Sequence, residues 1–340
     1  MDLLLETDVP LAAMNTFGVA ARAARLVRVH SQLDVRQLVD HPEFGIAPKL
    51  ILGGGSNLLL TDDPRQLVVK VEIQGLRVLR EDPDATIIEA GAGVSWHELV
   101  RWSLAQGYAG LENLALIPGT VGAAPVQNIG AYGLELAERF HALDAVDLTT
   151  GRVVTLDPTA CRFGYRDSLF KRELAGKSII TQVRLRLPKP WAPRVGYADL
   201  ERHFAKLGVA APDAQQIFDA VCAIRRTKLP DPAVLGNAGS FFKNPVVNRT
   251  IRNEILQDFP EIVSYPLEDG SYKLGAAWMI EACGWKGREL GRAAVDARHA
   301  LVLVNRGGAS GKEIKALAEA VQQAVRQKFG ITLEFEPLVV

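Results

Sequence analysis

The sequence predicts an α+β protein with more than one domain. Three observations lead to this prediction. The 340 residues are more than one ordinary core accommodates, short strands and helices mix in the first part of the chain, and helices dominate beyond three closely spaced prolines, Pro188, Pro190 and Pro193. Hydrophobic residues make up 48% of the chain and charged residues 23%, which is typical of a globular protein rather than a disordered one.

The composition also excludes several classes of protein. The 39 basic residues are balanced by 39 acidic ones, so no net positive charge drives nonspecific binding to nucleic acid or to a membrane surface. Three cysteines, Cys161, Cys222 and Cys283, are far apart and odd in number, which argues against a disulfide framework or a cysteine metal site. Residues 1–6 do not resemble a signal peptide, and no apolar run approaches the ~20 residues that span a bilayer. We therefore expect a cytoplasmic protein without a membrane or nucleic-acid partner.

The first half of the chain contains apolar, β-branched runs that predict strands. They cover residues 49–52, 68–71, 85–90, 145–148 and 179–185. A helix is predicted to begin at Trp96, because apolar residues follow at spacings of three and four, and to stop near Gly107. Ser95 and Glu98 have the spacing of a capping box for this helix.

The second half predicts four helices and a final strand. Cap residues mark three of the helix starts, and an apolar run marks the other. The caps are Asp213 with Gln216, Asn248, and Ser310 with Glu313; the uncapped helix covers residues 274–283, Gly284 and Gly330 are helix stops, and the strand covers residues 331–336.

Two glycine-rich segments in the first half suit a bound dinucleotide. Glycines 53–55 and the following Ser56 and Asn57 come after a strand, where backbone N–H groups can approach a pyrophosphate. The spacing is neither a Rossmann fingerprint, since Leu58 breaks it, nor a P-loop. Residues 117–133 are small and uncharged and predict a loop with a short helix against something flat. A plain turn for the first segment and tight packing for the second remain the alternatives.

Two further segments carry polar groups suited to chemistry. Arg166, between a tyrosine and an aspartate, can bind a carboxylate through two parallel N–H bonds, although a surface ion pair is the simpler interpretation. Ser240, between a glycine and a phenylalanine, could donate a proton; the alternative is a serine that satisfies its own turn. The Ser240 segment lacks the G-x-S-x-G elbow of hydrolases. Lys228 and Lys243 flank this region and could meet phosphates.

Two glutamates lie near the end of the chain. In the strand predicted for residues 331–336, Glu334 and Glu336 share one face, opposite Leu333 and Phe335. They could be solvent-facing charges, or one could act as an acid or base in a cleft. Strand parity does not choose between them.

In this order, these segments resemble the UDP-N-acetylenolpyruvoylglucosamine reductase family over nearly the whole chain. The resemblance implies that FAD is bound tightly but non-covalently, and that NADPH reduces it. The product is UDP-N-acetylmuramate for peptidoglycan, made from UDP-N-acetylglucosamine enolpyruvate. The matching blocks are residues 15–18, 53–57, 113–133, 161–168, 228–232, 236–245 and 333–336.

The resemblance also implies a fold of the vanillyl-alcohol-oxidase type. Two FAD-binding subdomains, residues 1–70 and 71–205, would be followed by a separate α+β substrate-binding domain, residues 206–320. Residues 321–340 would return to the FAD-binding half. The protein is expected to be a monomer and to need no metal. Tyr197 resembles the loop tyrosine that closes over the substrate in one subtype of the family.

Residue roles follow by the same resemblance. The flavin N5 hydride would attack the terminal carbon of the enol ether, Arg166 and Glu336 would stabilise the resulting charge, and Ser240 would donate the proton. Alignment with the family's last motif favours Glu336 as the catalytic carboxyl group, with Glu334 as the alternative. Phe335 departs from this motif, because the family usually has proline at its position. Residues expected at FAD are Gly53, Gly54, Gly55, Ser56, Asn57, Pro118, Gly119, Thr120, Gly122, Ala123, Asn128, Gly130, Ala131 and Tyr132; those expected at the substrate are Tyr165, Tyr197, Lys228, Asn244 and His299.

Overall fold

The computed structural model describes residues 3–340. Met1 and Asp2, the first two residues of the segment predicted not to be a signal peptide, lie outside this range. The chain divides into two compact units and passes between them several times. Unit 1 comprises the described residues up to Val9, Ala23–Gly55 and Pro64–Thr227, and unit 2 comprises Pro10–Arg22, Ser56–Asp63 and Lys228–Val340.

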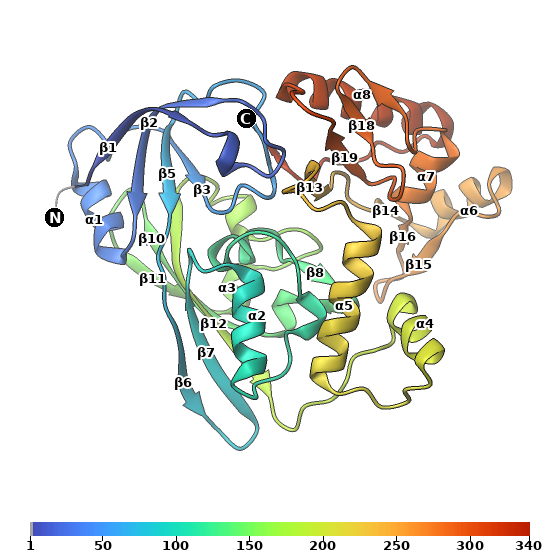
Figure 1. The fold of residues 1–340 in the computed structure, drawn as a ribbon, viewed down its shortest axis with the longest axis horizontal. Coiled ribbons are helices and arrows are strands. Elements are labelled where there is room, and N and C mark those ends of the chain that lie inside the picture. Colours follow the sequence, from blue (N-terminus) through green and yellow to red (C-terminus); the bar gives the residue numbers. More distant parts are fainter. Residues whose placement is uncertain (1–2) are drawn as a thin grey trace. The chain divides into compact units, whose positions relative to one another are not determined.

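Unit 1 contains a small sheet with a parallel centre. Its order is β1-β2-β5-β3, and β5 pairs in parallel with both β2 and β3 (Figure 1). Valines of β2 and β5 pack against Val35 and Leu38 of helix α1, which begins with a complete capping box at Ser31. The bounds are β1 Leu5–Pro10, β2 Arg22–Val29, α1 Gln32–Asp40, β3 Lys49–Leu52 and β5 Leu67–Val71.

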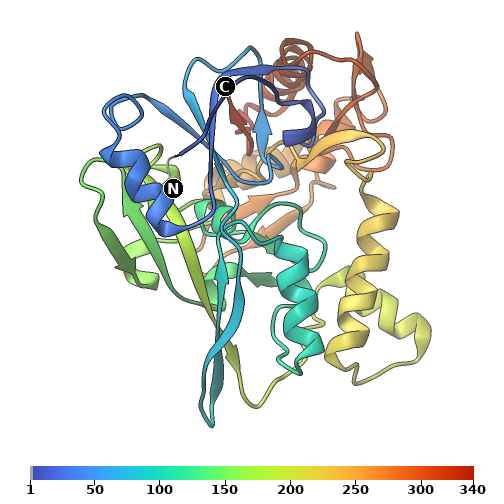
Figure 2. The same ribbon diagram turned by 60° about the vertical axis from the view of Figure 1, so that its left-hand side comes forward.

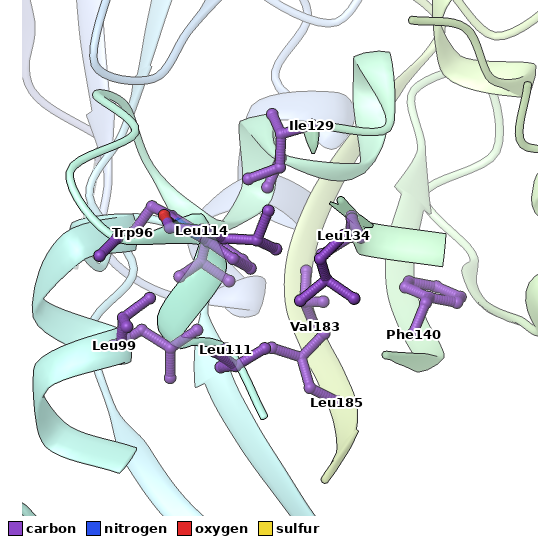
Figure 3. Packing of buried hydrophobic residues seen from close by; sticks show 14 of the residues in the cluster. Trp96, Leu99, Leu111, Leu114, Ile129, Leu134, Phe140, Val183 and Leu185 are labelled. Carbon is purple, nitrogen blue, oxygen red and sulfur yellow. Dashed lines mark hydrogen bonds between the residues drawn. The ribbon is translucent and has the colours of Figure 1, made fainter. Parts of the chain in front are cut away.

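A second, antiparallel sheet of unit 1 has the order β11-β10-β12-β7-β6. One buried cluster joins it to helices α2 and α5; Figure 3 shows Trp96 and Leu99 of α2 near Leu111 and Leu114, with Val183 and Leu185 of β12. The bounds are β6 Leu76–Glu81, β7 Ala85–Gly91, α2 Trp96–Ala105, β10 Phe140–Asp147, β11 Val153–Leu156, α3 Pro158–Cys161, β12 Ser178–Pro188, α4 Ala198–Leu207 and α5 Ala214–Lys228.

Helices α2 and α5 lie side by side in two views (Figures 1 and 2), and the ring of His97 on α2 stacks on Phe218 of α5. The α5 start is confirmed, because Asp213 and Gln216 exchange backbone-to-side-chain hydrogen bonds of 2.8 and 3.0 Å. The capping box predicted at Ser95 is wrong: its side chain makes no cap bond. The Trp96 amide instead donates to a carbonyl of the distant glycine-rich segment.

Between α2 and β10 the chain forms only short elements. This confirms the prediction of loop and short helix for residues 117–133. These elements are η2 Glu112–Leu114, η3 Val121–Ala123, η4 Pro125–Gln127, β8 Gly130–Ala131, β9 Leu134–Glu135 and η5 Leu136–Glu138; η6 Leu169–Lys171 follows α3.

Unit 2 has two small sheets, a two-stranded pair and three α-helices, with one large buried cluster and a smaller one at Ala294, Val302 and Val304. The sheet orders are β13-β19-β18-β17 and β14-β16-β15, and β20 pairs in parallel with β4. Helix α8 has the predicted capping box at Ser310 and ends at Gly330, while α6 is capped by Asn248. The bounds are η1 Ala12–Met14, β4 Leu58–Leu59, β13 Gly236–Ser240, β14 Val246–Val247, α6 Arg249–Asp258, β15 Ser264–Pro266, β16 Tyr272–Leu274, α7 Ala276–Ala282, β17 Glu289–Leu290, β18 Ala293–Val295, β19 Val302–Asn305, α8 Gly311–Phe329 and β20 Leu338–Val339.

The strand predicted for residues 331–336 is wrong. This segment forms a single bridge, Phe335 opposite Phe242, and a short strand begins only at β20. Pro337 has no N–H to donate, so it interrupts any ladder between the two. The Phe335 ring packs edge-on against Phe241 and Phe242, with centroids 5.2 and 5.6 Å away, and this packing holds the segment in place.

The two compact units have other boundaries than the predicted domains, whose division stays a prediction. Residues 206–227 lie in unit 1 with the two sheets described above, and residues 56–63 lie in unit 2 with the chain end. The assignment of subdomains to FAD and substrate stays a prediction. Within residues 3–340, no helix combines the length and the apolar character that crossing a membrane requires.

Candidate functional site

The two glycine-rich segments of unit 1 lie directly against each other. A Cβ added to Gly53 would come within 2.6 Å of Thr120 Oγ1, and one added to Gly54 within 2.9 Å of the Gly119 Cα. Gly55 adopts a positive φ of 63°, which glycine tolerates best. The predicted segments therefore form one surface of bare backbone, which side chains at these positions would disrupt.

The second segment is bound through its backbone to the short connection between β7 and α2. Amides of Val121 and Gly122 donate to carbonyls of Val94 and Ala92 at 2.8 and 2.9 Å. A Cβ on Gly122 would lie 2.5 Å from the Ala92 Cβ, so close packing of two elements also explains this glycine. Tight packing, the alternative interpretation of this segment, therefore accounts for Gly122.

Asn128 shapes the turn that ends this segment. It adopts a left-handed φ of 44°, and its buried side chain donates to Glu135 and to the Gly164 carbonyl at 2.8 and 3.0 Å. Its Oδ1 accepts the amide of Ala137 at 2.9 Å. The side chain is therefore engaged by the protein itself, so a role of Asn128 toward FAD would come through the turn that it forms.

Arg166 lies at the tip of a tight turn and reaches this segment. Gly164 and Asp167 exchange backbone hydrogen bonds of 3.0 and 3.2 Å, and Arg166 between them has a φ of 52°. Its guanidinium donates to the Gly130 carbonyl at 2.7 Å and lies 5.2 Å from the centroid of the Tyr165 ring. Within unit 1, the structure thus brings Arg166 and Tyr165 to the second glycine-rich segment.

The loop that carries Tyr197 is also bound to the second glycine-rich segment. The buried Asn113 amide donates to the carbonyls of Tyr132 and Arg194, both at 2.8 Å, and Arg194 donates to the Gly133 carbonyl at 3.3 Å. The rings of Tyr132 and Tyr197 meet edge to face, with centroids 5.2 Å apart. Burial raises the pKa of Tyr132 to about 12, so its hydroxyl is neutral at physiological pH.

In unit 2, Ser240 ends β13 at an irregularity in the sheet. The ladder with β19 shifts register between Asn237 and Ser240. The buried Asn237 side chain produces the shift: it donates to two nearby carbonyls and accepts the Gly239 amide at 2.9 Å, where φ is +69°. The half-buried Ser240 hydroxyl makes no hydrogen bond to any of residues 3–340, so the alternative of a serine satisfying its own turn is wrong.

The structure separates the two candidate glutamates. The amide of Glu336 donates to the Phe241 carbonyl at 2.9 Å, and its own carbonyl accepts Asn57 Nδ2 at 3.2 Å. Glu336 is therefore half-buried beside the residue that follows Ser240. The Glu334 carboxylate is 73% exposed and pairs with Lys243 at 3.0 Å. The environment of Glu334 is that of a surface ion pair.

The remaining predicted residues of unit 2 have mixed surroundings. Asn244 Oδ1 accepts the amide of Ala276 at 3.0 Å and so caps α7. His299 Nδ1 accepts the Leu301 amide at 3.3 Å, while Lys228 is exposed at the end of α5. Ser56 and Asn57 belong to unit 2, at the point where the chain leaves the glycine loop. Among residues 3–340, no group of His, Cys, Asp or Glu side chains could hold a metal ion.

Comparisons with known proteins agree with this arrangement. Residues 23–157 match the family model described as "FAD binding domain", and residues 231–340 match "UDP-N-acetylenolpyruvoylglucosamine reductase, C-terminal domain". The UDP-N-acetylenolpyruvoylglucosamine reductase of Paraburkholderia xenovorans is 58% identical over 331 residues, 97% of this chain and 96% of the relative. That of an Azoarcus species is 57% identical over 342 residues, covering 99% and 98%.

The chain belongs to the UDP-N-acetylenolpyruvoylglucosamine reductase family.

Membership in this reductase family makes the chain an FAD-binding oxidoreductase of peptidoglycan precursor synthesis. The crystal structure of the reductase from Thermus caldophilus matches with a TM-score of 0.68 at 25% identity, over 99% of both chains. The predicted vanillyl-alcohol-oxidase-type fold with a further α+β domain is thus confirmed. The residues present also fit FAD, because the Gly54 amide makes no hydrogen bond within residues 3–340 and lies on the side-chain-free surface.

Three residues that hold these candidate segments in place were not assigned a role from the sequence. Asn237 sets the register shift before Ser240, and Asn113 joins the Tyr132 and Tyr197 segments. His97 Nδ1 accepts the Leu116 amide at 3.0 Å, at the entrance to the second glycine-rich segment. An asparagine that directly follows a glycine is a turn signal that could have indicated Asn237. No local pattern indicates Asn113 or His97.

The His97 bond predicts a pH dependence of stability. Burial lowers the pKa of His97 below its ordinary 6.5, and the charges of Arg101, Arg225 and Arg226 act in the same direction, against Glu98. Because the unfolded chain then binds more protons, the stability from neutral His97 is complete above pH 6.5 and is lost as pH falls through the folded pKa.

Protonated His97 cannot accept the Leu116 amide at Nδ1, which is the structural counterpart of this loss. Replacing His97 by Asn, which keeps an acceptor but does not titrate, should flatten the dependence of unfolding free energy on pH between about 7.5 and 5. Urea unfolding at each pH measures it. The same change at the exposed His141 is the control, and equal slopes in both variants would contradict the assignment.

Proposed function

We propose that this chain reduces UDP-N-acetylglucosamine enolpyruvate to UDP-N-acetylmuramate, with NADPH as the electron source and FAD as the cofactor. Family membership and the FAD-binding domain support the reaction class. The observation that carries the mechanism is the Ser240 hydroxyl, which has no hydrogen-bond partner in residues 3–340 although its backbone is held firmly. A serine in this state can give its proton to a substrate.

The backbone of Gly53–Gly55 and of the segment around Gly119 would hold FAD, since the Gly54 amide makes no hydrogen bond within residues 3–340 and these glycines carry no Cβ to hinder close approach. Ser56 and Asn57 would add side-chain donors. When bound and reduced, FAD supplies the hydride that the enolpyruvyl double bond accepts. The residues of the chain would bind FAD and the substrate, orient them, and protonate the substrate.

Arg166 would stabilise the negative charge that develops over the enolpyruvyl carboxylate. Its bond to the Gly130 carbonyl and its contact with the Tyr165 ring hold the guanidinium in one orientation. A fixed cation needs little reorganisation as charge develops, which is the condition for strong electrostatic stabilisation.

Ser240 would donate the proton that completes the reduction, with Glu336 beside it. A serine hydroxyl is a poor acid in water, so this role requires a site from which water is excluded. Glu336 would help as a neutral acid or through a donor, because a bare carboxylate would repel the developing charge. The backbone bond of Glu336 to Phe241 supports its choice over the exposed Glu334.

Five residues would bind the rest of the substrate. Tyr197, joined to Tyr132 by ring contact, would close over the substrate as a loop tyrosine. The side-chain amide nitrogen of Asn244 would serve the substrate while its Oδ1 caps α7. The others are Tyr165, Lys228 and His299. We further propose that the protein acts as a monomer, which light scattering would check.

The test follows NADPH oxidation by the purified protein in the absence of air. Oxidation that requires UDP-N-acetylglucosamine enolpyruvate, one NADPH for each UDP-N-acetylmuramate detected by mass, is the expected result. NADPH oxidation with no product from this substrate would point to another flavoenzyme of the same fold. A protein that binds flavin but oxidises no NADPH would be a non-catalytic binder, and the proposal would be wrong.

A hydrolase that uses Ser240 as nucleophile is the remaining rival. Nucleophilic serines are activated by a base within hydrogen-bond reach. Within residues 3–340, the Ser240 hydroxyl has no such partner. The arrangement therefore favours a proton donor over a nucleophile.

A further inference from the structure

Lys70 lies behind the first glycine-rich loop and contacts it directly. β5 pairs in parallel with β3, and Lys70 is the partner of Leu52, the residue before Gly53. This register brings the Lys70 ammonium to the Gly53 carbonyl, to which it donates a hydrogen bond. Lys70 is also the one residue of β5 that is not fully buried.

The ammonium has no carboxylate partner. None of the ion pairs within residues 3–340 involves Lys70. The bond to the Gly53 carbonyl is the only hydrogen bond that the Lys70 ammonium makes within these residues. The nearby Glu72 is already bound by Arg28 at 2.8 Å. Burial without a partner lowers the pKa of Lys70, as expected for a cation removed from water. A positive charge in this state favours an anion nearby.

The hydrogen bond also orients the next peptide group. The Gly53–Gly54 peptide is trans, so its C=O and N–H point in opposite directions. With the carbonyl toward Lys70, the Gly54 amide points away from the lysine, and it makes no hydrogen bond within residues 3–340. A cation on the carbonyl polarises the peptide and strengthens its N–H as a donor.

We propose that Lys70 positions and polarises the Gly53–Gly54 peptide so that the Gly54 amide binds the pyrophosphate of FAD, while the ammonium adds positive charge behind the loop. Lys70 is a positioning residue that acts through the loop. The inference rests on the cofactor site proposed above. It extends the description of that site, because it explains why an uncharged glycine loop would bind an anion: a lysine from a neighbouring strand supplies the positive charge.

Binding of FAD to the apoprotein, followed by flavin fluorescence, tests the proposal. Lys70→Met removes both charge and donor and should raise the dissociation constant of FAD about tenfold or more. Lys70→Arg keeps both and should bind FAD within about threefold of the wild type. The salt dependence of FAD binding should be flatter in Lys70→Met, because one cation near the pyrophosphate is lost.

Lys49 offers a matched control. It is another partly buried lysine of the same sheet, and it donates to the Gly45 and Ala47 carbonyls, both at 2.9 Å, rather than to the glycine loop. Burial likewise lowers its pKa. Lys49→Met should therefore lower the melting temperature of the apoprotein about as much as Lys70→Met does, yet leave FAD affinity and its salt dependence unchanged.

The possible outcomes distinguish a failure of the Lys70 proposal from a failure of the proposed function. Equal FAD affinity and equal salt dependence in Lys70→Met and the wild type would show a purely structural lysine and overturn the proposal. If Lys70→Met does not fold, Lys70→Gln takes its place, since it removes the charge and keeps an amide donor; binding within twofold of the wild type would again overturn it. A wild-type protein that does not bind FAD would instead refute the proposed function.

Discussion

Replacing Ser240 by alanine is expected to lower turnover about 10²- to 10⁴-fold, the range that a positioned proton donor contributes. The folded state should be nearly unaffected, because the hydroxyl makes no hydrogen bond within residues 3–340 and its loss leaves no partner unsatisfied. Flavin binding should also be unchanged, since Ser240 lies outside both glycine-rich segments.

Rapid mixing without air separates the two halves of this reaction. In Ser240→Ala, consumption of NADPH should keep its rate while formation of UDP-N-acetylmuramate becomes slow. Ser240→Cys, which restores an acidic hydrogen on a side chain of similar shape, should recover part of the rate. Unchanged product formation in Ser240→Ala would remove this residue from the mechanism.

Glu336→Gln is expected to lower turnover about 10²- to 10³-fold, whereas Glu334→Gln should change it less than about threefold. Both variants should fold. The backbone bonds of Glu336 to Phe241 and Asn57 do not involve the carboxylate, and Glu334 loses only a surface ion pair with Lys243.

The paired design tests the choice between the two glutamates. Steady-state rates of both variants, with melting temperatures to confirm folding, give the ranking. A loss of activity in Glu334→Gln with normal activity in Glu336→Gln would reverse the assignment. Equal and small effects in both would remove the carboxyl group from the reaction.

Local signals in the sequence predicted several elements correctly. β3 covers the predicted residues 49–52, and the capping box at Ser310 and the cap at Asn248 are both present. Each of these signals depends on residues within about four positions of one another, or on alternation along one strand.

The failed predictions involve competition from distant residues. The box at Ser95 has the right spacing, but Ser95 forms a β-bridge with the distant Thr120 and the local exchange does not form. The segment 331–336 alternates like a strand, yet Phe335 packs on Phe241 and Phe242 and only one bridge remains. Neither distant partner leaves a trace in the local pattern.

The sequence by itself determined the family, the FAD site class and the candidate residues, because motif order and glycine content are written in the chain. Only the tertiary structure decided how those residues are placed. It laid Gly53 and Gly54 against Thr120 and Gly119, left the Ser240 hydroxyl without a partner, and distinguished Glu336 from Glu334. It also placed Lys70 behind the glycine loop. The physical reason is that burial and hydrogen-bond partners depend on segments far apart in sequence, which meet only when the chain folds.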